Sequence, residues 1–222
     1  MSSAIQYQGR KARRAGSEQR RQAILEAALN IIVKEGIRAV RHRAVAREAE
    51  VPLSATTYYF KDISDLIADT FTLFAERALK DVIEPFKERA FALLSQFSRD
   101  SLADAQERQR LIDMMGKMMA AFIVDELNTR RGHLVAEQAF MQEAIMDSRL
   151  RELADLYLHQ QLESLMIATE LFGSSNPRLD AELILMAMMS IEQRLLVHPE
   201  KISEEFVEVR MCNLLDKLLP RG

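Results

Sequence analysis

Apolar residues recur at intervals of three and four along nearly the whole chain, which is the spacing of one face of an α-helix. The segments with this spacing beyond residue 62 lie at about 64–82, 86–98, 101–128, 133–146, 149–172, 179–196 and 203–219. Only 7 Gly and 5 Pro occur, and breaks are expected at Pro85, at Gly132, over 173–177 and at His198-Pro199. No stretch alternates as a half-buried strand does. The chain is therefore predicted to be all-α.

Several protein classes are excluded by composition. The single cysteine, Cys212, cannot form an intrachain disulfide, so nothing requires an oxidising compartment. The apolar runs 118–124 and 183–189 are far shorter than the roughly 18 residues that cross a bilayer. No apolar segment of the kind found in secretory signals follows the basic N-terminal residues. We expect a cytoplasmic protein with no membrane span.

Charge is distributed unevenly along the chain. Residues 1–61 contain 12 Lys and Arg against 5 Asp and Glu, a formal charge of +7, whereas the other residues contain 18 and 28, a charge of −10. A chain with this asymmetry is suited to meet a polyanion at its basic end. The alternative is a solvated basic tail on an otherwise neutral domain.

The segment 17–61 has the pattern of three short helices. Ser17 can cap a first helix, and apolar residues from Ile24 to Val33 continue it until Gly36 ends it. An alanine-rich run over 43–49 predicts a second helix, and residues 53–60 form the third segment. Two short helices joined by a tight turn are typical of a DNA-reading module.

The third segment is rich in β-branched and aromatic residues, which favour a strand, but no second strand lies near enough to pair with it. As a helix, it places Thr56 and Phe60 on one face, above Val51. The opposite face has side chains that can meet phosphates and base edges, namely Ser54, Thr57, Tyr58 and Lys61. We therefore expect a helix whose outer face reads DNA.

Gly36, residues 40–60 and Asp65-Leu66 together resemble the helix-turn-helix signature of TetR-family transcriptional regulators. The resemblance covers roughly residues 17–70. It implies a homodimer that reads a palindromic operator, usually as a repressor that a small molecule releases. By position, it places the DNA-binding role on Arg41, His42, Arg43, Leu53, Ser54, Ala55, Thr57, Tyr58, Tyr59 and Lys61.

This sequence departs from the family pattern at several positions. Glu50 stands where the family prefers Gly, and a side chain there costs about 1 kcal/mol if its φ is positive. Arg41 replaces a helix-capping Ser or Thr, Thr57 replaces a common aromatic residue, and Ile63 stands where a lysine often touches phosphate. Arg41 is therefore a candidate phosphate contact.

The resemblance leads us to expect three regions. These are a flexible basic arm over 1–16, a DNA-binding domain over 17–62, and an effector-binding and dimerisation domain over 63–222. Lys11, Arg13 and Arg14 in the arm either follow the minor groove or remain solvated.

Methionines in the body are concentrated on two helical segments. Met adapts to varied apolar partners, although stripes of this kind are usually core. Few charges interrupt residues 111–124, so a pocket here would take an apolar effector. The candidate ligand-binding residues are Leu93, Phe97, Met114, Met115, Met118, Met119, Phe122 and Phe140.

Dimerisation needs an apolar surface beyond the one that the core uses. The segments 149–172 and 179–196 contain enough apolar residues for a four-helix bundle between two subunits, or for internal packing. The candidate interface residues are Leu153, Leu156, Leu162, Leu165, Ile184, Leu185, Met188 and Ile191.

No cofactor, metal or catalytic residue is expected. His133 with Glu137 and His159 with Glu163 are pairs four residues apart, but two ligands do not make a metal site. Cys212 lies between apolar residues and is expected in the core. Two alternatives remain open: an all-α enzyme acting on an apolar substrate, for which no catalytic motif is found, and a helical adaptor, which would not bind DNA.

Overall fold

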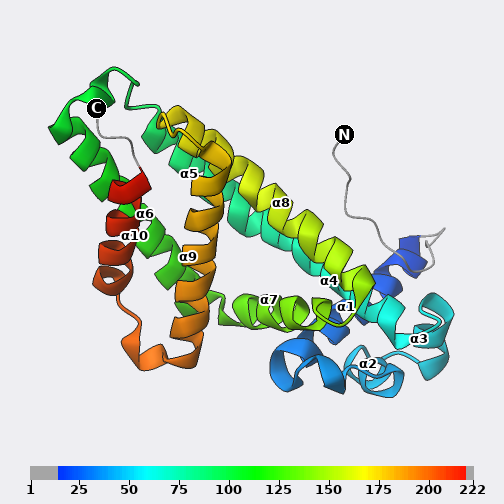
Figure 1. Ribbon diagram of the computed structural model, residues 1–222. Helices are drawn as coiled ribbons and strands as arrows, with labels where there is room; N and C mark the ends of the chain where they lie inside the picture. The colour runs from blue at the N-terminus through cyan, green and yellow to red at the C-terminus, as the bar shows by residue number, and fades with distance from the viewer. Residues whose placement is uncertain (1–14, 219–222) are drawn as a thin grey trace. The chain divides into compact units, whose positions relative to one another are not determined.

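The computed structural model describes residues 15–218, where all regular secondary structure is helical, as the periodicity predicted (Figure 1). The first helices are α1 (Ala15–Glu35), α2 (His42–Glu48), α3 (Leu53–Tyr59) and α4 (Ile63–Ala78). The remainder are α5 (Glu84–Leu94), α6 (Ala105–Thr129), α7 (Arg131–Ala144), α8 (Ser148–Leu171), α9 (Pro177–Val197) and α10 (Glu204–Leu218). Short 3-10 turns lie at Ile37–Ala39, Ser101–Ala103 and Pro199–Lys201.

The chain packs into two compact units. Among the described residues, unit 1 comprises 15–78 and 135–157, and unit 2 comprises 79–134 and 158–218. Unit 1 thus adds α4, most of α7 and the first part of α8 to the three N-terminal helices. The expected division at residue 62 separates a DNA-binding role from an effector-binding and dimerisation role. It does not describe how the helices pack, and it stays a prediction.

Aromatic side chains form the centre of unit 1. The rings of Phe71 and Phe140 stack with centroids 4.6 Å apart, and Tyr157 meets Phe71 edge-on at 6.2 Å. Phe74 lies 5.4 Å from Phe140. Because such pairs contribute beyond the area they bury, they fix α4 against α7 and α8.

A buried ion pair joins α1 to α4 in the same unit. A guanidinium nitrogen of Arg21 lies 2.5 Å from a carboxylate oxygen of Asp69, and both side chains are buried. The guanidinium carbon also lies 5.5 Å from the centroid of the Phe60 ring. Since removing one partner would leave an uncompensated buried charge, the pair holds α1 in a defined register on α4.

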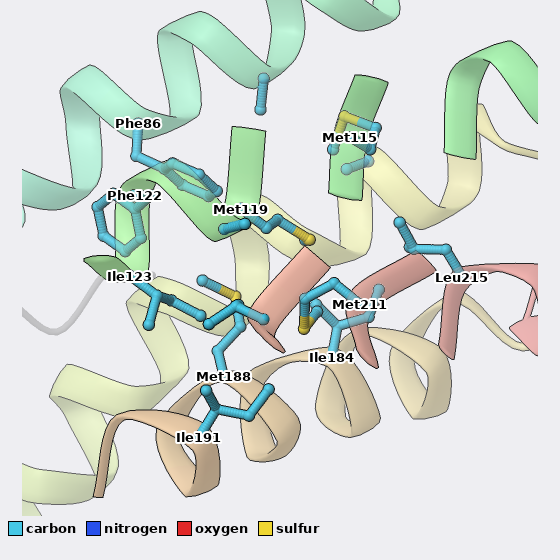
Figure 2. Packing of buried hydrophobic residues seen from close by; sticks show 14 of the residues in the cluster. Phe86, Met115, Met119, Phe122, Ile123, Ile184, Met188, Ile191, Met211 and Leu215 are labelled. Carbon is cyan, nitrogen blue, oxygen red and sulfur yellow. The ribbon is translucent and has the colours of Figure 1, made fainter. Parts of the chain in front are cut away.

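In unit 2, α6 packs along α10, and α9 contacts both (Figure 1). Their buried side chains interdigitate in an apolar cluster that includes Met119 and Ile123 of α6, Met188 of α9 and Met211 of α10 (Figure 2). Phe86 of α5 closes one side, with its ring centroid 4.3 Å from that of Phe122.

Gly116 sets the close approach of α6 and α10. A Cβ atom built on Gly116 would lie 2.2 Å from Cys212 Sγ, far inside van der Waals contact. The Cys212 thiol also lies 3.7 Å from the Ile112 carbonyl oxygen. Gly116 lies within the regular helix α6, so its backbone conformation does not require glycine. What the close approach requires is the absence of a side chain.

Two helix boundaries differ from expectation. The break expected at Pro85 is absent, because residues Leu79–Ile83 form a π-helical turn that leads into α5. Pro85 then lies in the first turn of α5, where its missing N–H is tolerated. α6 begins at Ala105 rather than 101, because the Asp104 side chain caps it by accepting from the N–H groups of residues 106 and 107.

Candidate DNA-binding surface and effector pocket

The turn between α2 and α3 is closed by a Schellman motif. The Val51 N–H donates to the Ala46 carbonyl at 3.0 Å, and the Glu50 N–H donates to the Arg47 carbonyl at 3.2 Å. Glu50 therefore occupies the left-handed position of the motif, with φ of 52°. The positive φ confirms that a side chain at residue 50 is strained. The motif also fixes the angle at which α3 leaves α2.

α3 is a helix with the two faces that its sequence predicts. Thr56 and Phe60 are fully buried, whereas Ser54, Thr57 and Lys61 are exposed. Tyr58 is 54% exposed and Leu53 is 41% exposed, while Ala55 is half-buried. The outer face of α3 thus combines apolar, hydroxyl and cationic groups, which together can contact thymine methyls, base edges and phosphates.

Tyr59 is the exception among the predicted contacts on α3. Its side chain is only 6% exposed, and its ring lies 5.1 Å from that of Tyr58 in an edge-on pair. Its hydroxyl forms a hydrogen bond of 2.7 Å with Ser17 Oγ of α1. Tyr59 is therefore a packing residue that joins α3 to α1, and Ser17 lies inside α1 instead of capping it.

Three consecutive basic residues lie where α2 begins. Arg41 occupies the N-cap position in an extended conformation, and its side chain makes no capping hydrogen bond. Arg41 and Arg43 are exposed, and His42 is half-buried. The two guanidinium groups are thus accessible at the edge of the helix-turn-helix.

Sequence reasoning missed part of this surface. A hollow of about 700 Å³ lies between the start of α1 and α3, lined by Gly16, Ser17, Arg20, Pro52, Ser54, Ala55, Tyr58 and Tyr59. Arg20 is exposed and adds a cation to the lining of the hollow, which Tyr58 also lines. In the sequence, only the positive charge of the N-terminal region indicated this part of the surface. The arm residues Lys11, Arg13 and Arg14 lie outside the described residues.

The residues predicted to line an effector pocket do not come together as one set. Met115, Met119 and Phe122 are buried in the closed core of unit 2 (Figure 2). Leu93, Phe97 and Met118 pack partly buried against that core, and Met114 is half-buried. Phe140 belongs to unit 1, where it stacks on Phe71. The methionine stripe of α6 therefore fills the core.

Unit 2 has a cavity at a different place. Its volume is about 580 Å³, and residues from the end of α5, the segment before α6, α6 itself and the end of α8 line it. These residues are Phe91, Leu94, Ser95, Phe97, Arg99, Leu102, Leu111, Ile167, Glu170, Leu171 and Phe172. Only Phe97 was predicted, because the other walls come from segments far apart in the sequence.

The apolar residues proposed for a dimer interface also divide. Ile184, Met188 and Ile191 of α9 are buried in the core of unit 2, which corrects their assignment. Leu153 and Leu162 are buried as well, whereas Leu156, Leu165 and Leu185 are partly buried. The apolar residues that α9 leaves exposed share one helical face: Leu179, Leu183, Met186 and Val197.

The remaining candidates have ordinary structural partners. Glu126 Oε2 lies 3.4 Å from His133 Nδ1. His159 and Glu163 form an exposed pair at 3.3 Å. Burial raises the pKa of the Cys212 thiol, and the charge of Asp113 adds to this effect, so the thiol is not activated.

Within residues 15–218, no cluster of three or more His, Cys, Asp or Glu side chains is arranged to hold a metal ion. None of the helices in this range combines the length and the apolar character that crossing a bilayer requires.

Helix-turn-helix geometry followed by a helical body defines a class of DNA-binding regulators. No family model matches the chain, and no curated protein matches it significantly. Solved structures do match it. A TetR-family member from Streptomyces coelicolor is 22% identical, with TM-score 0.61 over 91% of this chain and 99% of that one.

Two further structures agree. A transcriptional regulator from Rhodococcus is 17% identical, with TM-score 0.62 over 90% of this chain and 95% of that one. The multidrug binding protein EbrR, solved with ethidium, is 23% identical, with TM-score 0.61 over 90% and 99%. The chain therefore has the fold of TetR-family transcriptional regulators.

Proposed function

We propose that this protein is a sequence-specific DNA-binding transcriptional regulator that acts as a homodimeric repressor, and that a small apolar effector releases it from a palindromic operator. The observation that carries the proposal is the outer face of α3. Its exposed Ser54, Thr57 and Tyr58 lie on a helix that a Schellman turn and the buried Phe60 hold in place. A helix presented in this way enters the major groove. Because such a role requires access to the chromosome, the proposal includes a cytoplasmic location, and it includes no enzymatic activity.

The proposed dimer interface uses the exposed apolar face of α9. Met186 is 64% exposed, and Leu179 and Leu183 precede it at helical spacing. On the end of α8, Ile167 and Leu171 are also exposed. Two such helices from each subunit would form a four-helix bundle, and a two-fold axis would relate the two copies of α3 as a palindrome requires.

The cavity of unit 2 is the proposed effector site. Three phenylalanine rings, those of Phe91, Phe97 and Phe172, line it together with aliphatic residues, which favours an apolar effector. Arg99 and Glu170 lie in the lining, and an Arg99 nitrogen donates to the Glu170 carbonyl oxygen at 3.4 Å. The similar protein EbrR is solved in complex with proflavin and with ethidium, which supports a ligand site in this fold.

The test begins with selection of bound sequences from a random duplex pool. The expected result is an enriched palindrome whose half-sites are centred about one helical turn, roughly 10 bp, apart. Fluorescence anisotropy with that duplex and a scrambled one across a salt series then measures the specificity. Tyr58→Ala is expected to lower affinity for the selected duplex by about tenfold or more.

A matched pair of lysine variants separates phosphate contact from total charge. Lys61 and Lys201 are both exposed, but only Lys61 follows α3. Because the proposed homodimer has two copies of Lys61, Lys61→Ala is expected to reduce the slope of log affinity against log salt by about 1.8, roughly 0.9 for each lost phosphate contact, whereas Lys201→Ala leaves it unchanged. Absence of salt-dependent binding to any duplex would refute the DNA-binding role and favour a helical adaptor or an enzyme.

A further inference from the structure

A second hollow lies within unit 1, apart from the outer face of α3. Its volume is about 550 Å³, within the range of small-molecule sites. Residues 37–42, the first half of α4 and the end of α7 form its walls. The lining residues are Ile37, Arg38, Val40, Arg41, His42, Ile63, Ile67 and Glu143. Half of them are aliphatic, so the hollow offers an apolar surface with charged groups around it.

Within residues 15–218, three polar groups of this hollow have no side-chain partner, those of Arg38, Arg41 and His42. The His42 Nδ1 atom is buried and has no hydrogen-bond partner among the described residues. Buried polar atoms nearly always have a partner, so this atom is suited to a ligand. In the part of the chain that the structure describes, neither Arg38 nor Arg41 takes part in an ion pair. Two guanidinium groups and an imidazole thus line one cavity without a carboxylate bound to them.

The charges of the lining restrict the class of ligand. Arg38 and Arg41 supply two positive charges and Glu143 supplies one negative charge, so the lining is net positive even with His42 neutral. A guanidinium binds a carboxylate through two parallel hydrogen bonds. A monoanion balances the lining's net charge of +1, whereas a dianion such as a phosphate monoester would leave an excess negative charge beside Glu143. The aliphatic walls of Ile63 and Ile67 favour a ligand with a compact apolar body.

We propose that this hollow binds a small monocarboxylate with an apolar body, as a site separate from the effector cavity of unit 2. The carboxylate is held by Arg38 and Arg41 with His42, and the body packs on the isoleucines of α4. Arg41 and His42 also belong to the proposed DNA surface. If the proposed function holds, an occupied site therefore weakens operator binding, because the carboxylate and the DNA phosphates compete for the same cations.

Isoleucine side chains provide a reporter for each site. Ile37, Ile63 and Ile67 line the hollow of unit 1, whereas Ile167 lines the cavity of unit 2. The full chain would be labelled with ¹³C at the isoleucine δ1 methyls and titrated without DNA. The probes are octanoate, phenylacetate and indole-3-acetate, each compared with its primary amide, which has nearly the same shape and no charge.

Saturable shifts of the Ile63 and Ile67 methyls are expected with at least one carboxylate, at a Kd on the order of 1 mM or below, and the matching amide is expected to bind at least about tenfold more weakly. Arg38→Gln is expected to weaken this response about tenfold and to leave any response of Ile167 unchanged. Glu143→Gln is expected to strengthen carboxylate binding or leave it unaltered, since it removes a repulsion.

Three results would overturn the site. The first is that no carboxylate at about 10 mM shifts the isoleucine methyl signals of unit 1. The second is that a carboxylate and its amide shift them equally, and the third is that Arg38→Gln binds the carboxylate with undiminished affinity. Weaker carboxylate binding by Glu143→Gln would contradict the repulsion on which the choice of ligand rests and would also overturn the site. The competition with DNA is tested separately by anisotropy, and a bound carboxylate that leaves operator affinity unchanged refutes it. The methyl titration decides the site even if the DNA-binding role fails.

Discussion

Gly116→Ala is expected to have opposite effects on stability in two backgrounds that differ at residue 212. The new Cβ atom would lie 2.2 Å from Cys212 Sγ, but 3.5 Å and 3.6 Å from the backbone nitrogen and the Cβ atom of that residue. The sulfur is therefore the one atom among these that blocks it. Replacing Cys212 by Ala removes the sulfur and leaves only ordinary van der Waals contacts.

The magnitude follows from two opposing terms. Forcing a methyl group against the partly buried Cys212 thiol costs about 3 kcal/mol, at the upper end of the usual range for overpacking, which a separation this short warrants. Replacing Gly by Ala inside a helix stabilises it by about 1 kcal/mol. Gly116→Ala alone is thus expected to lower the free energy of unfolding by about 2 kcal/mol, whereas in the Cys212→Ala background it should raise it by about 1 kcal/mol.

Urea unfolding followed by circular dichroism at 222 nm, at one protein concentration for all four chains, measures the double-mutant cycle. The coupling free energy expected between the two positions is about 3 kcal/mol, and effects of Cys212→Ala by itself cancel in the cycle. Equal effects of Gly116→Ala in the two backgrounds would show that α6 and α10 are not as close at this point as the structure has them.

Glu50→Gly is expected to stabilise unit 1 by about 0.5–1 kcal/mol, because it relieves a side chain at positive φ, whereas Ala49→Gly, one residue earlier at ordinary helical φ, should destabilise it by a similar amount. Tyrosine fluorescence of this tryptophan-free chain reports this, since Tyr58, Tyr59 and Tyr157, the tyrosines among the described residues, lie in unit 1. A common sign for the two variants would contradict the strain. Burial raises the pKa of Glu126, but hydrogen bonds from His133 and Arg130 outweigh this, so the pKa lies below its ordinary value. The stability that this carboxylate contributes is therefore present above about pH 4.5 and is lost as pH falls through the lowered pKa. Between pH 7 and pH 3, the unfolding midpoint of Glu126→Gln should fall less than that of the unsubstituted chain. Parallel pH profiles for the two chains would refute the assignment. Met186→Glu is expected to convert the proposed homodimer to a monomer in sedimentation velocity while leaving its helicity intact, and a variant that sediments as a dimer would exclude the exposed face of α9 as the interface.

The DNA-binding surface shows how far a sequence pattern reaches. The third segment was correctly predicted as a helix against its β-propensity, and Thr56 and Phe60 are on its buried face, because a helix of seven residues leaves little choice of orientation once its apolar side is known. Tyr59 was assigned to the wrong surface because its neighbours on α3 do not reveal that α1 covers it. Arg20 was missed for the same reason: it shares a hollow with Tyr58 because two segments nearly 40 residues apart pack together.

The body of the protein shows a different limit. The methionines of α6 and the apolar residues of α9 were correctly expected on helices, but each helix has more than one apolar stripe, and periodicity does not tell which stripe meets the core. Met119 and Met188 are core, whereas Met186, two residues from Met188, is exposed. The cavity of unit 2 was not predicted, because its walls come from α5, α6 and α8.

Helix positions, the strained turn at Glu50 and the basic character of the N-terminal region were determined by the sequence, since each depends on residues within a few positions of one another. The contact of Gly116 with Cys212, the two hollows of unit 1, the cavity of unit 2 and the exposed apolar face of α9 were decided by the tertiary structure alone. These features arise where helices distant in the chain approach one another. Because protein interiors are closely packed, the size of a single atom can decide how near two helices lie and which side chains line the space between them.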